Sequence, residues 1–118
     1  MAGLSANGRN VGLNAIGAVG LYVSLHTADP GTSGTSEVTG GSPAYARKAV
    51  TWAAASGGSM ALNAGVTFDV PAGTTVTHFG VWSASTSGTY YGGGALSASE
   101  SFGAQGTYNL TTATISIT

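Results

Sequence analysis

Residues 20–47 read GLYVSLHTADPGTSGTSEVTGGSPAYAR, and the fold can be inferred outward from this stretch. From Leu21 apolar and polar residues alternate, which places Leu21, Val23 and Leu25 on one face of a strand. The strand stops at residues 29–31, where the sequence DPG is typical of a turn. A long loop rich in Gly, Ser and Thr follows, and extended sequence resumes at the end of the stretch. The pattern predicts a strand that carries a long loop.

The rest of the chain repeats this organisation. Further extended runs cover residues 44–54, 62–70, 75–83, 89–96 and 108–117. Turn residues separate them roughly every 8–12 residues, a spacing typical of sandwiches and barrels. Three consecutive glycines at residues 92–94 predict a bulge or a close backbone approach within one strand. We therefore predict an all-β fold, a single small antiparallel β-sandwich, jelly-roll-like, over residues 20–118.

The first residues have a different period. Leu4, Val11, Ala15 and Ala18 recur at helical spacing, although four glycines in the same segment each weaken a helix by about 1 kcal/mol relative to alanine. We expect residues 1–19 to form a short N-terminal helix or arm.

Charge is scarce in this chain. Charged residues make up 6% of the 118 residues, against roughly 25% in ordinary soluble domains. Gly, Ala, Ser and Thr together exceed half of the chain, so much of its near-neutral surface is expected to meet other protein, with a homo-oligomer as one outcome. The three basic residues form no stripe, which argues against nucleic acid. The apolar segment at residues 11–25 is too short to span a membrane.

Four of the nine Asp, Glu, Lys, Arg and His side chains, namely His26, Asp29, Glu37 and Arg47, lie within residues 20–47. Serines near His26 and Asp29 match no catalytic arrangement. A metal site would draw on His26, Asp29, Glu37, Asp69 and His78, but the pair His26 and Asp29 lacks a convergent third ligand. We expect no enzyme, cofactor or metal site. Asp29 is instead expected to form a turn, and either Arg47 or Lys48 to pair with Glu37 or Asp29.

Aromatic residues divide into two groups. The first, Trp52, Phe68, Phe79 and Trp82, lies in alternating strands and is predicted to form core. The second is predicted to offer an exposed contact or glycan-stacking surface and comprises Tyr45, Tyr90 and Tyr91. The candidate structural or interface residues are therefore His26, Asp29, Glu37, Tyr45, Arg47, Tyr90 and Tyr91.

The sequence resembles small virion proteins of tailed phages, especially those of actinobacteria, over about residues 20–110. The resemblance rests on the following motifs: LYVSLHTADPG from residue 21, EV at 37, GG at 40, YAR at 45, FDVPAGTTV from 68, HFGVW from 78 and GGGAL from 92. It implies a non-enzymatic structural subunit of the phage particle, made in the host cytoplasm, with no catalytic residues to transfer.

Two functions remain open within that resemblance. The leading hypothesis is a capsid decoration protein on the head surface, which binds the major capsid protein or other virion proteins through the N-terminal arm and the loop after Asp29. Small size, low charge and the lack of fibre-like repeats favour it. The alternative is a tail-fibre or tail-tip module that binds a receptor or glycan through Tyr90, Tyr91 and the glycine-rich loops.

Overall fold

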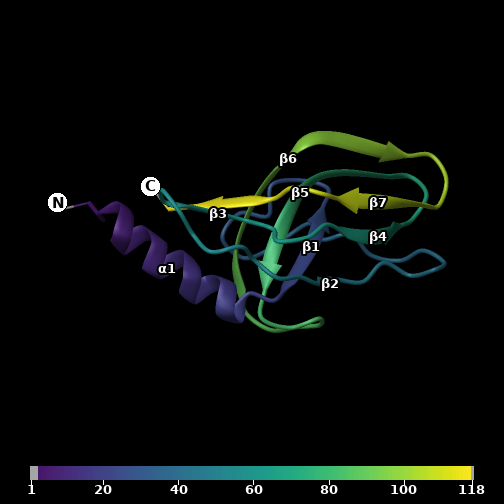
Figure 1. Cartoon of the computed structure of the whole chain (residues 1–118). Coiled ribbons are helices and arrows are strands. Elements are labelled where there is room, and N and C mark those ends of the chain that lie inside the picture. The colour runs from purple at the N-terminus through teal and green to yellow at the C-terminus, as the bar shows by residue number, and fades with distance from the viewer. Residues whose placement is uncertain (1–2, 118) are drawn as a thin grey trace.

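One helix and eight strands make up the part of the chain described by the structure, a computed structural model that covers residues 3–117 (Figure 1). In order they are α1 (Ala6–Val19), β1 (Tyr22–His26), β2 (Lys48–Ala49), β3 (Ser59–Ala61), β4 (Val66–Val70), β5 (Thr74–Trp82), β6 (Tyr90–Phe102), β7 (Gly106–Leu110) and β8 (Thr114–Ser116). Met1, Ala2 and Thr118 lie outside the described residues. The molecule is elongated, with extents of 47 × 24 × 24 Å.

The strands form three antiparallel sheets. The largest has the order β2-β1-β5-β6, and two-stranded sheets are formed by β3 with β8 and by β4 with β7. In the central pair, Tyr22 lies opposite Trp82 and His26 lies opposite His78. The predicted all-β antiparallel fold with a short N-terminal helix is confirmed. That residues 1–19 and 20–118 behave as separate parts stays a prediction.

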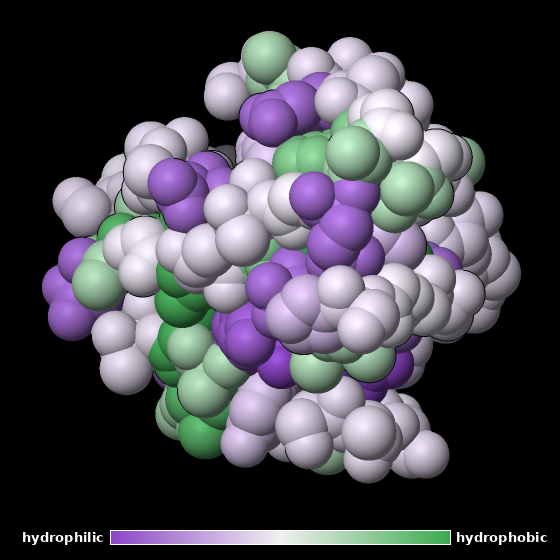
Figure 2. Space-filling model, turned by 90° about the vertical axis from the view of Figure 1, so that its right-hand side faces the viewer, coloured by the Kyte–Doolittle hydropathy of each residue, from purple (hydrophilic) through white to green (hydrophobic). Residues whose placement is uncertain are grey.

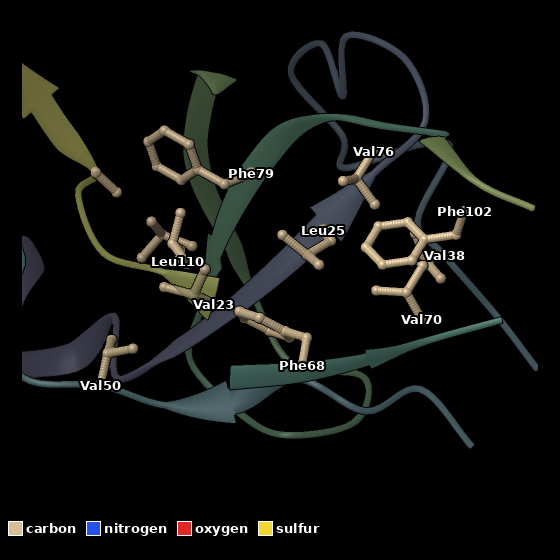
Figure 3. Close-up of a cluster of buried hydrophobic side chains, with 12 residues drawn as sticks. Val23, Leu25, Val38, Val50, Phe68, Val70, Val76, Phe79, Phe102 and Leu110 are labelled. Carbon is tan, nitrogen blue, oxygen red and sulfur yellow. The ribbon is translucent and has the colours of Figure 1, made fainter. Parts of the chain in front are cut away.

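The core lies between the large sheet and the β4–β7 pair (Figure 3). Its fully buried members include Val23 and Leu25 of β1, Phe68 of β4 and Val81 of β5. Three of the four aromatic residues predicted as core, Phe68, Phe79 and Trp82, are at most 9% exposed, while Trp52 is half-buried against the cluster. Burial of this apolar area from water is the main force holding the sheets together.

The helix begins and ends at recognisable caps. The backbone N–H of Gly8 donates to Ser5 Oγ over 3.1 Å, and Gly20 ends the helix by donating to the Ile16 carbonyl. Leu13 is its fully buried residue. A Cβ atom on Gly17 would come within 3.0 Å of the Met60 sulfur, so this glycine lets the helix lie close to the strands. The glycines that weaken the helix are partly explained by this packing.

Two of the predicted extended runs differ from the strands that the structure forms. The run at 44–54 contains only β2, and the run at 108–117 splits into β7, which pairs with β4, and β8, which pairs with β3. Buried Ala113 lies between them. Alternation in sequence records which side chains face inward, but not the point at which a strand changes partners.

The predicted close approach at residues 92–94 is confirmed. These glycines lie within β6, opposite residues 79–81 of β5, and the pairing is irregular where Val81 gives way to Trp82. A Cβ atom on Gly93 would collide with the backbone oxygen of Phe79. Glycine is therefore required there by the spacing of two backbones.

The surface matches the unusual composition. Figure 2 views the molecule from the right-hand side of Figure 1 and shows mostly pale, near-neutral residues, with hydrophilic and apolar residues in scattered groups. This is the appearance expected of a chain with 6% charged residues.

We predict that Gly93→Ala lowers the free energy of unfolding by about 1–3 kcal/mol, because the added methyl group must push apart two paired strands. The measurement is urea denaturation followed by tryptophan fluorescence. Gly103→Ala is the matched control, since a Cβ atom there meets nothing within 4 Å. Equal stability of the two variants would contradict the prediction.

Candidate functional site

The polar face of β1 is buried. Ser24 and His26 are both 0% exposed, although the alternation of the sequence allows this face to meet solvent. Trp82 Nε1 donates to Ser24 Oγ over 2.8 Å, Ser24 Oγ lies 2.6 Å from His26 Nε2, and His26 Nδ1 lies 2.7 Å from the Thr35 carbonyl oxygen. A carbonyl only accepts, so Nδ1 carries the proton and Nε2 accepts from the serine hydroxyl. This chain fixes one tautomer of a neutral imidazole.

Burial lowers the pKa of His26 below its ordinary value of 6.5, against a smaller opposing effect of the Thr35 carbonyl. In the neutral ring, Nδ1 donates to the Thr35 carbonyl and Nε2 accepts from the Ser24 hydroxyl, so both nitrogens have a partner. His26 is therefore a structural histidine that joins β1 to the long loop.

Glu37 and Arg47 form a bidentate ion pair beside this chain. Arg47 Nε and one terminal nitrogen donate to the two carboxylate oxygens, each over 2.9 Å. The Arg47 side chain is 9% exposed and the Glu37 side chain is 21% exposed. The Tyr45 hydroxyl donates to Glu37 over 2.9 Å and accepts from the Leu25 N–H over 2.9 Å. Of the pairings that the sequence left open, between Arg47 or Lys48 and Glu37 or Asp29, the structure forms that of Arg47 with Glu37.

The same guanidinium lies on the face of an aromatic ring. Arg47 Cζ is 3.6 Å from the centroid of the Trp82 ring, a cation–π contact. Its remaining terminal nitrogen donates to the carbonyls of Ala84 over 3.1 Å and Ser87 over 2.8 Å. Arg47 therefore ties the turn after β5 to the long loop, and its hydrogen-bonding capacity is directed at the protein itself.

The two halves of the loop are anchored separately. In the first half, the Gly31 N–H donates to Asp29 Oδ1 over 2.9 Å, which confirms the turn predicted for Asp29. Gly34 has a φ of +76°, and a Cβ atom there would overlap the Trp82 ring. In the second half, Gln105 accepts from the Ser42 N–H and donates to the Pro43 carbonyl, each over 3.2 Å.

A shallow depression of about 310 Å³ opens over this cluster. It is lined by Glu37, Val38, Thr39, Gly40, Tyr45, Ala46, Arg47, Ser85, Thr86 and Ser87. Because Arg47 and the Glu37 carboxylate are paired with each other, the remaining polar groups of the depression are mainly hydroxyl and backbone groups, set in a lining that is more apolar than polar. Within residues 3–117 no group of three acidic, His or Cys residues could hold a metal ion. No helix in that range is long and apolar enough to cross a membrane.

The structure brings His26, Glu37, Tyr45 and Arg47 together, while Asp29 lies in the exposed first turn of the loop. Tyr45 is half-buried rather than exposed, because its ring stacks on Phe68 with centroids 6.3 Å apart. Burial raises its pKa well above the usual range.

The two neighbouring tyrosines point to opposite sides of β6. Tyr90 packs on Trp82, with ring centroids 5.1 Å apart, and its hydroxyl is buried without a hydrogen-bond partner among the described residues. Burial raises its pKa, as does the nearby Asp29 carboxylate. Tyr91 is 38% exposed. The pair therefore does not form one aromatic face, and the interface role of either residue stays a prediction.

Sequence reasoning missed two members of the cluster. Ser24 seemed an ordinary polar residue of a strand, and Trp82 was assigned to the core alone. The available signal was positional: Ser24 and His26 share one face of β1, and Trp82 is the aromatic residue at the end of the neighbouring strand.

A comparison with protein families matches residues 11–118 to the family described as Podophage GP4 fiber I protein gp80. The chain belongs to this family. The match covers nearly all of the fold just described, including most of α1, and it makes the protein a structural component of a phage virion, associated with other virion proteins. No curated protein sequence matches the chain. The predicted resemblance to phage virion proteins is confirmed, and the family description favours the tail-fibre alternative over capsid decoration.

We predict that Arg47→Met lowers the free energy of unfolding by about 3 kcal/mol, because it leaves the carboxylate of Glu37 and the carbonyls of Ala84 and Ser87 without their donor. Exposure of Glu37 keeps the loss near the lower end for buried pairs. Chemical denaturation measures it.

Lys48→Met is the matched control, since it removes the same charge one residue away and is expected to change stability by less than about 1 kcal/mol. The double variant Glu37→Gln, Arg47→Met should lose less than the sum of the two single variants. Additive losses would show that the pair does not act as a unit.

We predict that the free energy of unfolding falls as the pH drops below about 6.5. The pKa of His26 is lowered in the folded state, so the unfolded chain takes up a proton first. This stability is fully present above pH 6.5 and is lost as the pH falls through the folded-state pKa.

NMR titration of the imidazole signals measures the folded-state pKa directly, with His78→Asn used to assign the two histidines. A His26 signal that titrates above pH 6.5 would refute the neutral buried ring.

Proposed function

We propose that this chain is a non-enzymatic module of a podophage tail fibre. The observation that carries the proposal is the family match, which extends over residues 11–118 and is named for a fibre protein. The elongated body and the near-neutral surface support it, because a fibre module must lie against other protein along its length. The actinobacterial origin suggested by the sequence stays a prediction.

Within a fibre, the depression over the Arg47 cluster is the candidate surface for a receptor. Its rim is held by the Glu37–Arg47 pair and by the carbonyl contacts to the turn at residues 84–87, so it is preformed. Hydroxyl and backbone groups on a lining that is otherwise apolar, with its charges paired internally, suit an uncharged, hydroxyl-rich ligand such as a glycan.

The location on the virion tests the proposal. We expect immunogold labelling of intact particles to decorate tail appendages, and quantitative mass spectrometry to count far fewer copies of this chain than of the major capsid protein. A particle that lacks the gene product should lose density at the tail. Gold on the head, together with a copy number close to that of the capsid protein, would establish capsid decoration instead.

A further inference from the structure

An uncharged apolar stripe runs along the outer side of α1. Val11, Ala15 and Ala18 project from one side of the helix, and Leu13, which is buried against the sheets, projects from the opposite side. Leu4 immediately precedes the Ser5 cap and continues the same spacing in sequence. Leu4 is 57% exposed and Val11 is 70% exposed. Figure 1 shows α1 lying along the outside of the strands. The helix therefore uses one side for the fold and leaves the other side uncovered.

The exposed large apolar side chains of the described residues lie on the stripe or next to it. These are Leu4, Val11, Val19, Leu21 and Tyr91. Val11 and Val19 belong to the helix, and Leu4 and Leu21 lie just before and just after it. Tyr91 lies near the end of the helix, because its ring is 3.5 Å from where a Cβ atom on Gly20 would stand. Large apolar residues gathered on one uncharged surface mark a protein contact rather than scattered exposure.

The helix is rigidly held in this orientation. Asn10 and Asn14 accept hydrogen bonds from the backbone N–H groups of Gly58 over 3.0 Å and Ala55 over 2.9 Å. Arg9, the charged residue of α1, donates to the Leu4 carbonyl over 3.0 Å and lies beside Gly58, away from the stripe. The helix cannot turn its apolar side inward without breaking these contacts.

We propose that this stripe binds a second copy of the chain. Along it, the large residues Leu4 and Val11 are followed by the small residues Ala15 and Ala18, at a spacing of four and three from Val11. A second identical stripe supplies hollows at the small residues for the large ones, which is the packing of ridges into grooves between helices. The absence of charge on the stripe removes like-charge repulsion between copies.

The apolar surface extends beyond the helix. A helix of 14 residues is about 21 Å long, and one side of it alone falls short of the roughly 800 Å² that each partner buries in a standard interface. Val19 at the end of the helix is exposed, and Leu21 and Tyr91 continue the apolar surface beyond it towards the edge of the large sheet. The contact is thus expected to include both the helix and the start of β6.

This inference names a partner for the proposed fibre module. It is tested on the purified chain, so its failure would leave the location on the virion untouched. In sedimentation velocity, we expect wild-type protein to self-associate with rising concentration, and Val11→Glu to weaken that association at least tenfold, because it buries a carboxylate in the contact. Ala104→Glu is the matched control: it adds the same charge at an exposed residue of the β6–β7 turn, at the opposite end of the molecule from the helix N-terminus (Figure 1).

Disulfide trapping gives a second readout, since the chain contains no cysteine. We expect Val11→Cys to form a covalent dimer on mild oxidation and Ala104→Cys to remain monomeric. Wild-type protein that stays monomeric at millimolar concentration, or association that Val11→Glu leaves unchanged, would overturn the proposal. The first of these results would assign the stripe to a different virion protein.

Discussion

The contact of the Arg47 guanidinium with Glu37 on one edge and with the Trp82 ring on one face is the constraint on which the rest of the loop structure depends. It joins three segments that are distant in sequence: the long loop, the extended run before β2 and the turn after β5. A planar guanidinium can satisfy a carboxylate, an aromatic face and backbone carbonyls at once, which the point charge of lysine cannot do. A loop with almost no regular structure thereby acquires one conformation.

The buried hydrogen-bond chain beneath this contact follows the same principle. The chain runs from Trp82 through Ser24 and His26 to the Thr35 carbonyl, and each of these groups forms a hydrogen bond with its neighbour. These buried polar groups are therefore paired. Many of the few charged and polar side chains of this protein therefore form hydrogen bonds within the fold. Its surface is left to small neutral residues, which suits a component that lies against other proteins in an assembly.

Local patterns in the sequence predicted the features that local forces determine. The alternation from Leu21 predicted β1, the helical spacing of Leu4, Val11, Ala15 and Ala18 predicted α1, and Asp29 predicted its turn. Leu21 itself precedes β1 and is 41% exposed, because the face that it shares with Val23 and Leu25 is covered only from Val23 onward.

The features that sequence could not predict depend on distant partners. Alternation alone left the side of Ser24 and His26 open to solvent, and only the path of the loop over Trp82 buries it. In the same way, Tyr90 and Tyr91 look equivalent in sequence, but the position of Trp82 draws the first inward and leaves the second exposed.

The two surfaces of interest differ in how fully they are satisfied. Around Arg47 the charged groups are paired inside the chain, so this region is complete as folded and can present a fixed shape to a ligand. The outer side of α1 differs, because its large apolar side chains stay substantially exposed in the described part of the chain. In a chain with so few charges to keep it apart from its neighbours, that difference is the reason for proposing that the helix serves assembly and the loops serve recognition.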